Sequence, residues 1–174
     1  MTDDCAECGF AYDLELAPSV ASLAGEYAAR YADLLLRTER SALARRAEAG
    51  VWSPLEYACH VRDVLLVQRE RVLSARRTDT PVATPMGRDE RVEHEGYALQ
   101  DPSDVARQLT DAASLFGNVL HRLPAVDWER TLVYSYPEPA ERSLRWVAVH
   151  TLHELRHHLL DARRRLPRPA GAEN

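Results

Sequence analysis

Two helix-start signals, each with a proline at the first helical position, constrain the fold of this chain most strongly. Ser53-Pro54-Leu55-Glu56 combines an N-cap serine, a proline and a glutamate at capping-box spacing. Asp101-Pro102 opens a second segment in a similar way, and Pro124 ends it. These signals predict helices over residues 53–77 and 102–123.

Two further segments have a helical pattern. In residues 18–48, Pro18 suits a helix start, Ser19 can cap it and Gly50 suits its end. Its apolar stripe recurs at three-to-four spacing and consists of Leu23, Tyr27, Tyr31, Leu34 and Leu35. A last helix is predicted over residues 143–165, where Pro167 stops it. Four helices with one long crossing connection predict an all-α four-helix bundle.

The remaining segments define the domain organisation. Residues 78–100 hold two prolines and two glycines among charged residues, which predicts a long connection, and such connections are often functional. Residues 128–142 predict either a short hairpin or an irregular arm before the last helix. We therefore expect an N-terminal arm over residues 1–17, a bundle over residues 18–166 and a flexible tail over residues 167–174.

Composition narrows the class of protein. The chain has 174 residues, of which 45% are hydrophobic, so one domain with a real core is expected. A formal net charge of −5 argues against sequence-independent binding of nucleic acids. No apolar run is long enough to cross a bilayer, and the acidic N-terminus lacks a signal core, so we expect a cytoplasmic protein with reduced thiols. The absence of lysine and isoleucine indicates a GC-rich genome.

The densest chemical signal is the run of residues 150–158, His-Thr-Leu-His-Glu-Leu-Arg-His-His. Residues four apart on a helix lie nearly one above the other, so His153 and His157 can point at one metal ion. His150 is an alternative to either of them, and His60 is the best candidate for a third ligand from another helix. The competing interpretation is a polar helix face or a set of packed core histidines.

Three imidazoles leave an open position on a zinc-like ion, which is the pattern of a catalytic site. Carboxylates usually orient such histidines. Asp63, Glu154 and Asp161 are candidates for that role, although each could equally be a solvated acid or an ion-pair partner of arginine.

At these residues the chain resembles the DinB-like superfamily of metal-binding four-helix bundles. The resemblance rests on Trp52-Ser53-Pro54-Leu55-Glu56 leading to His60, on residues 153–158 of the last helix, and on residues 88–99 before the third helix. It spans about residues 18–165. It implies a divalent metal, zinc or nickel, bound by His60, His153 and His157.

The resemblance also bears on the reaction. Some members use a low-molecular-weight thiol such as mycothiol or bacillithiol, and a GC-rich, actinobacterial source favours mycothiol. The mycothiol-dependent maleylpyruvate isomerases carry glutamate at the first place of the ligand pair. This chain has His153 there, which argues against that isomerisation.

The N-terminal arm carries Cys5 and Cys8 in a Cys-x-x-Cys-Gly knuckle. Three interpretations compete: a second metal site completed by a histidine, a thiolate lid over the bundle's metal, or an ordinary flexible terminus. A redox role lacks the strand–helix context of thioredoxin. Cys59 is adjacent to His60 but points away from it, so we expect it in the core.

The leading functional hypothesis is a metal-dependent transferase that joins a small thiol, such as mycothiol, to an electrophilic small molecule. The alternatives are a metal-dependent hydrolase or isomerase without a thiol, and a non-catalytic metal-binding stress protein. No nucleic-acid or membrane partner is expected, and a homodimer is one option for the assembly.

Overall fold

A computed structural model describes residues 4–136 and 138–167, and its four long helices confirm the predicted bundle. They are α1 (Val20–Arg37), α3 (Pro54–Arg77), α5 (Pro102–His121) and α6 (Leu144–Arg164). None of these helices is long and apolar enough to span a membrane. From residue 168 onward, the predicted tail lies outside the described residues.

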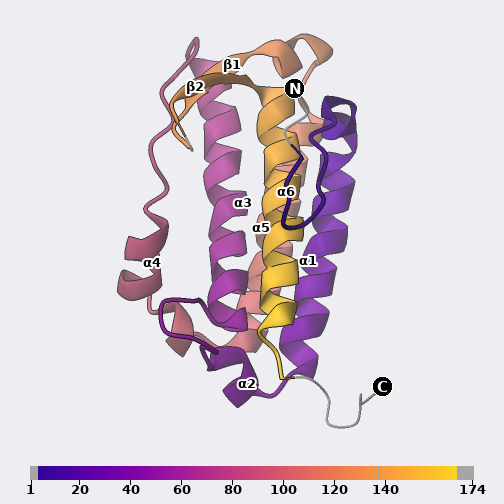
Figure 1. The fold of residues 1–174 in the computed structure, drawn as a ribbon. Coiled ribbons are helices and arrows are strands. Elements are labelled where there is room, and N and C mark those ends of the chain that lie inside the picture. Colours follow the sequence, from indigo (N-terminus) through magenta and orange to yellow (C-terminus); the bar gives the residue numbers. More distant parts are fainter. Residues whose placement is uncertain (1–3, 137, 168–174) are drawn as a thin grey trace.

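The order of the helices around the bundle differs from their order in the chain. α1 packs on α5, α5 on α3, α3 on α6, and α6 on α1, so α1 and α3 lie across the bundle from each other (Figure 1). α3 and α5 run in the same direction, so the chain between them must return along the length of the bundle (Figure 1). This return is the long crossing connection. It also leaves α3 and α6 as antiparallel neighbours.

The predicted helix starts are present as hydrogen bonds. The Glu56 amide donates to Ser53 Oγ at 3.3 Å, and the Ser53 amide donates to the Glu56 carboxylate at 2.7 Å, which completes the capping box of α3. At α5, Asp101 accepts from the Ser103 amide at 2.9 Å. At α6, Ser143 Oγ accepts from the Trp146 amide at 3.3 Å. These caps fix where α3, α5 and α6 begin.

The prediction of one helix over residues 18–48 was wrong at both ends. Pro18 lies inside a 3-10 helix, Leu14–Ser19, and Ser19 makes no side-chain cap. The chain leaves the helix at Thr38 in an extended conformation and resumes as α2 (Arg40–Ala44). No proline or glycine marks this break. The change of direction packs α2 against α3 and buries Leu43 completely.

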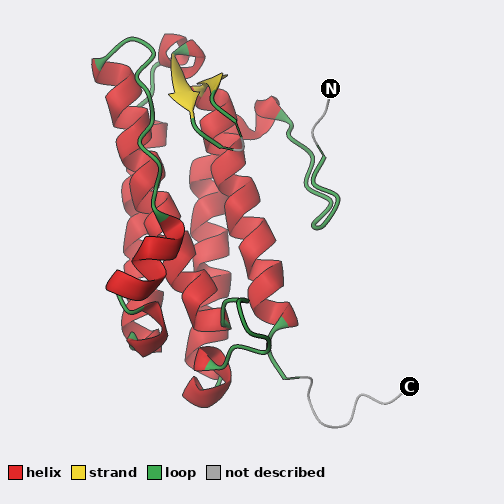
Figure 2. Ribbon diagram, turned by 60° about the vertical axis from the view of Figure 1, so that its left-hand side comes forward, coloured by secondary structure: helices red, strands yellow, loops and turns green. Residues whose placement is uncertain are grey.

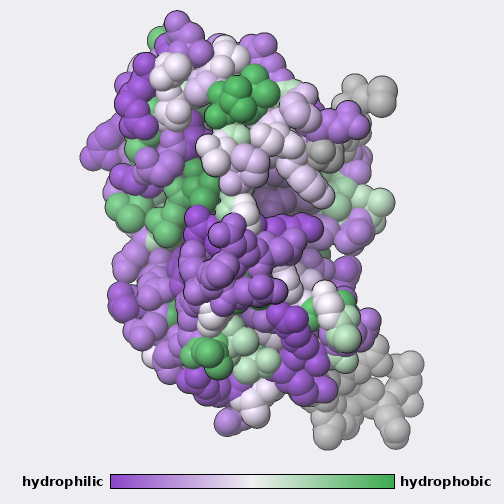
Figure 3. All heavy atoms as spheres, turned by 90° about the vertical axis from the view of Figure 1, so that its left-hand side faces the viewer, coloured by the Kyte–Doolittle hydropathy of each residue, from purple (hydrophilic) through white to green (hydrophobic). Residues whose placement is uncertain are grey.

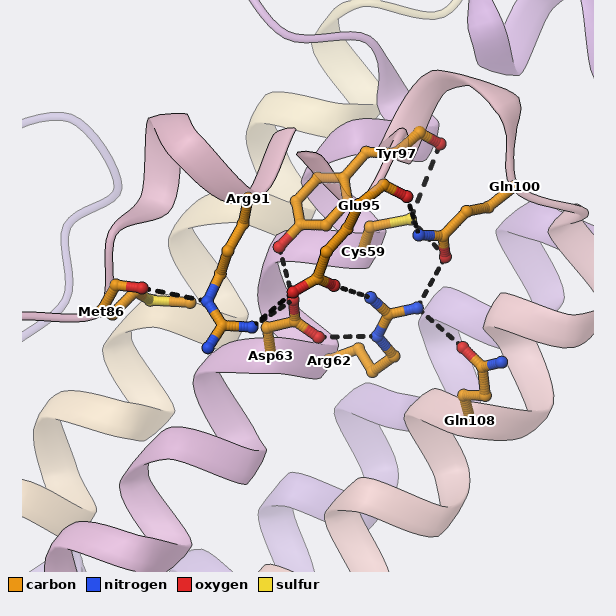
Figure 4. A network of polar contacts seen from close by, with 9 residues as sticks. All are labelled: Cys59, Arg62, Asp63, Met86, Arg91, Glu95, Tyr97, Gln100 and Gln108. Atoms are coloured by element: carbon orange, nitrogen blue, oxygen red, sulfur yellow. Dashed lines mark hydrogen bonds and ion pairs between the residues drawn. The ribbon is translucent and has the colours of Figure 1, made fainter. Parts of the chain in front are cut away.

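The connection at residues 78–100 is more ordered than predicted. It contains α4 (Arg88–His94), which follows Gly87 at φ +67°, and a 3-10 helix at Tyr97–Leu99 (Figure 2). Its anchor is Asp63 of α3, which is buried (Figure 4). Asp63 accepts from Arg62 at 2.8 Å, from Arg91 at 3.3 Å and from the hydroxyl of the fully buried Tyr97 at 2.5 Å. Burial alone would raise the pKa of Asp63, but these bonds hold it below its usual value.

The segment before α6 forms the hairpin that was one of its two predicted forms. β1 (Thr131–Tyr134) pairs antiparallel with β2 (Ala140–Ser143), with Thr131 opposite Ser143. Val82 of the connection adds a bridge to Val133. The hairpin therefore joins the start of α6 to the start of the connection at one end of the bundle.

Candidate functional site

α6 carries two pairs of potential metal ligands, offset from each other by one residue. His153 and His157 are four residues apart, and so are Glu154 and His158. A shift of one residue turns a side chain by about 100° around the helix axis. The two pairs consequently face different neighbours.

Glu154 and His158 face α3 and form, with His60, what we call the histidine–glutamate cluster. Donor atoms of these three residues lie within 4.8 Å of one another. The Glu154 carboxylate is 3.9 Å from His60 Nε2 and 3.4 Å from His158 Nε2. His60 is only 4% exposed, and its ring packs at 5.0 Å from that of Trp52. The cluster thus joins α3 to α6 through side chains that the core holds in place.

The electrostatics of this cluster suit a cation. Burial would raise the pKa of Glu154, but His158 and His60 hold it well below its usual value, so the carboxylate is ionised. Burial would lower the pKa of His158, but hydrogen bonds to Asp161 and Glu154 raise it to about 9. The Asp161 carboxylate accepts from His158 Nδ1 at 3.1 Å, which leaves Nε2 directed toward Glu154.

The donor set fits a divalent metal ion. Two imidazoles and one carboxylate are the ligands of several catalytic zinc sites, where the remaining position is left for water or substrate. A carboxylate behind a ligand histidine, as Asp161 stands behind His158, is the usual support in such sites. The expected outer role of Asp161 therefore has a geometric basis, whereas Asp63 is engaged by Arg62, Arg91 and Tyr97 instead (Figure 4).

A cavity of about 830 Å³ opens beside the cluster, between α3, α6 and the connection. Residues 85–88 of the connection form part of its wall, and the face that carries this connection is hollowed near its centre (Figure 3). The apolar part of the lining includes Val64, Val67, Met86, Tyr134 and Trp146. The prediction that the connection is part of a functional region remains a prediction, but its position against this cavity agrees with it.

Arginines give the cavity a positive wall. Arg71, Arg88 and Arg142 all line it. Arg71 donates to the Tyr134 hydroxyl at 2.9 Å, and the Arg142 guanidinium lies 4.8 Å from the centre of the Trp146 ring. These contacts hold two guanidinium groups at the cavity, where they can meet an anionic ligand.

His153 and His157 face the N-terminal arm and lie with Cys5 and Cys8 in what we call the cysteine–histidine cluster. One donor atom from each of the four lies within 4.8 Å of the others. The structure therefore distributes the three histidines predicted to share one ion over two clusters, with His60 in one and His153 and His157 in the other.

His150 lies between the two clusters. Tyr12 places its hydroxyl 2.8 Å from His150 Nδ1 and 2.9 Å from His153 Nδ1. The His150 ring stacks on Trp146 at 4.6 Å, and its burial lowers its pKa to about 4, so it is a neutral imidazole in the cavity wall.

His158 is the residue that sequence reasoning misses, and Glu154 is expected only as an outer carboxylate. Both pairs on α6 have the same four-residue spacing, so the spacing cannot choose between them. The choice depends on the rotation of α6 against α3, which is set by tertiary packing. Cys59, predicted to lie in the core, is fully buried.

Comparisons with known proteins agree with this fold. The protein-family model of the DinB superfamily matches residues 13–162 of the chain. No curated protein matches the chain. Among solved structures, YfiT from Bacillus subtilis, described as "a probable metal-dependent hydrolase with an unusual four-helix bundle topology", has a TM-score of 0.73 and 17% identity, with 87% of each chain covered.

A second solved structure is that of the mycothiol-dependent maleylpyruvate isomerase. Its TM-score is 0.68 at 13% identity, and the match covers 86% of this chain. The chain spans 60% of the length of that isomerase. At these identities, both similarities show a common fold.

Proposed function

Because the chain belongs to the DinB superfamily, we propose that it is an enzyme whose divalent metal ion is held by His60, Glu154 and His158. The observation that carries this proposal is the convergence of three donors, one of them an ionised carboxylate, beside a large cavity. Zinc is the metal that best fits two imidazoles and a carboxylate, and nickel is the alternative. This proposed set shares His60 with the predicted set of His60, His153 and His157, and it differs in the two ligands from α6.

The residues of the cluster have separate roles in this proposal. Glu154 brings a negative charge that neutralises half of a divalent ion, and Asp161 fixes the tautomer of His158. When bound, such an ion would lower the pKa of a thiol or water and polarise a substrate carbonyl. The rings of Trp52 and Tyr57 pack at 5.0 and 5.4 Å from those of His60 and His158 and so hold these two imidazoles in place.

The cavity favours a small anionic electrophile as substrate. Arg71 and Arg142 can pair with a carboxylate, while Trp146 and Tyr134 offer apolar surface next to them. A volume of about 830 Å³ exceeds the needs of a small acid and leaves room for a second reactant. A low-molecular-weight thiol such as mycothiol is the co-substrate that we propose, in keeping with the fold shared with a mycothiol-dependent enzyme.

In the reaction that we propose, the thiol loses its proton to solvent at the site and its sulfur adds to an electrophilic carbon–carbon double bond of the substrate. The π bond breaks as the carbon–sulfur bond forms, and the neighbouring carbon then takes up a proton, so that no group leaves. A second candidate is a thiol-dependent isomerisation. The sequence argument against isomerisation was that the first ligand contributed by α6 is a histidine instead of a glutamate. That argument holds only if the two ligands from α6 are His153 and His157. In the pair Glu154 and His158 the first place is a glutamate, so that objection no longer applies.

The setting that we propose is the cytoplasm, where the three free cysteines would stay reduced.

The test is a survey of electrophilic carboxylic acids with and without mycothiol, using metal-loaded and metal-free protein. We expect turnover that requires both metal and thiol. Glu154→Gln should lower kcat/KM by at least 100-fold, because it removes the only charged ligand, whereas His94→Ala, an exposed histidine on α4, should have no effect. Metal-dependent turnover that ignores every thiol would point to a hydrolase, and full activity in Glu154→Gln would overturn the site.

A further inference from the structure

The N-terminal arm folds into a knuckle that presents two sulfur atoms to α6. The Gly9 amide donates to the Cys5 carbonyl at 2.8 Å, and the Cys5 amide donates to the Phe10 carbonyl at 2.9 Å. Gly9 has φ +63°, which a glycine adopts without strain. The turn places Cys5 and Cys8 on the same side, and Arg156 of α6 holds it there by donating to the Cys8 carbonyl at 2.9 Å.

One sulfur–nitrogen distance in the cysteine–histidine cluster matches that of a tetrahedral zinc site, and the remaining donors lie close enough to share the ion. With Zn–S bonds of about 2.3 Å and Zn–N bonds of about 2.0 Å, a sulfur and a nitrogen ligand of one ion lie about 3.5 Å apart. Cys5 Sγ lies 3.6 Å from His157 Nδ1. The four donors all lie within 4.8 Å of one another, and all the cysteines are free thiols. The side chains are therefore already arranged around a point that one ion could occupy.

The two imidazoles each keep one nitrogen for that point. His153 Nδ1 is engaged by the Tyr12 hydroxyl at 2.9 Å, while its Nε2 is buried and has no hydrogen-bond partner among the described residues. His157 Nε2 lies 3.4 Å from carboxylate oxygens of both Asp161 and Glu7, which leaves Nδ1 for the sulfur side. Partners of this kind on the far nitrogen orient the histidines of metal sites. A buried, unpaired imidazole nitrogen is costly, and a metal ion removes that cost.

The order of the ligands along the chain supports the same conclusion. Cys-x₂-C spacing on a tight turn and His-x₃-H spacing on a helix are the two halves of a Cys₂His₂ zinc finger. In this chain most of the sequence lies between the cysteine pair and the histidine pair, so neither pair alone has the pattern of a zinc finger. The fold brings them together because the arm runs back along α6 (Figure 1).

We propose that Cys5, Cys8, His153 and His157 bind a structural zinc ion, separate from the ion of the histidine–glutamate cluster. Four protein ligands leave no open position, so this site fastens the arm and does no chemistry. The ion would also stabilise the position of Tyr12, which lies in the cavity wall and whose hydroxyl bonds His153 and His150. The proposal rests on these side chains alone and stands whether or not the proposed reaction is correct.

Cobalt substitution tests the site in the whole protein. Protein stripped of metal and reloaded with Co²⁺ should show the charge-transfer absorption bands of a sulfur-bound cobalt ion. The Cys5→Ser, Cys8→Ser double variant should lose these bands, and Cys59→Ala should keep them as the matched control. Glu154→Gln should also keep them, which separates this ion from the other one.

Metal analysis of the untreated protein and of the double cysteine variant gives a second readout. We expect about two zinc ions per chain, falling to about one in the double cysteine variant with unchanged helicity. Wild-type protein that lacks the charge-transfer absorption would overturn the proposal. So would bands that survive in the double cysteine variant, or a Cys5–Cys8 disulfide in protein purified without oxidant.

Discussion

Removing the carboxylate of Asp63 should destabilise the protein without changing its metal content. Asp63 is 3% exposed and accepts hydrogen bonds from Arg62, Arg91 and Tyr97. In Asp63→Ala, the buried Arg62 guanidinium loses its nearest anion and Tyr97 loses the acceptor of its hydroxyl. Deletion of one partner of a buried ion pair costs about 3–5 kcal/mol.

The lower end of that range applies here. Arg62 keeps the side-chain oxygens of Gln100 at 2.6 Å and Gln108 at 2.7 Å, and it keeps the more distant Glu95 at 3.4 Å. We therefore expect a loss of about 3 kcal/mol in the free energy of unfolding. The comparison variant is Asp104→Ala, whose partner Arg107 is 63% exposed, and its loss should stay below about 0.5 kcal/mol.

Urea unfolding followed by circular dichroism measures both losses, and metal analysis of the folded variants measures the ion. Because the carboxylate's pKa is lowered by folding, the stability that Asp63 provides is present at neutral pH and is lost as the pH falls through its folded-state value. The gap between wild type and Asp63→Ala should thus narrow in acid. Equal losses in Asp63→Ala and Asp104→Ala would refute the reasoning, and lost metal in Asp63→Ala would restore Asp63 as a support of the metal site.

Three further changes probe the caps, the clusters and the arm. Ser53→Ala should lower the free energy of unfolding by about 1–2 kcal/mol, measured by urea unfolding, because it removes one half of a buried capping box. In metal-free protein, the His158 pKa of about 9 exceeds the unfolded value of 6.5. Its stabilising contribution, about 3 kcal/mol at most, is therefore complete below pH 6.5 and is lost as the pH rises through 9, and urea unfolding of His158→Gln should lack this decline. Tyr12→Phe should release zinc from the cysteine–histidine cluster at least several-fold faster to a chelator, since His153 loses the partner of its far nitrogen, and a rate equal to that of wild type would contradict this.

The bundle could be predicted because its signals are local. The capping box at Ser53 and the proline after Asp101 act within four residues, so α3 and α5 begin where the sequence indicates. The break at Thr38 has no local signal, because what favours it is the burial of Leu43 against the bundle. α4 was missed for a similar reason, since Val92 is the only buried residue within it.

The sequence places candidate ligands on α3 and α6, but it does not settle which side of α6 faces α3. Spacing predicts that α6 offers potential metal ligands four residues apart, and it predicts His60 on the partner helix. It does not fix the rotation of α6, so Glu154 and His158 could not be chosen over His153 and His157. For the same reason, a second metal site at Cys5 and Cys8 was one of three interpretations of the sequence, and no histidine partner could be named for it.

The long return between α3 and α5 also constrains how the protein folds. Helices that are consecutive in the chain do not pair as simple hairpins, because α1 contacts α5 and α3 contacts α6. Loop closure over such separations is slow, so we expect this bundle to fold more slowly than one of up-down-up-down order. During synthesis, His60 leaves the ribosome long before Glu154 and His158, and Cys5 and Cys8 earlier still. Each cluster therefore stays incomplete until α6 has been made, and a metal ion captured sooner would be held by only part of its ligands.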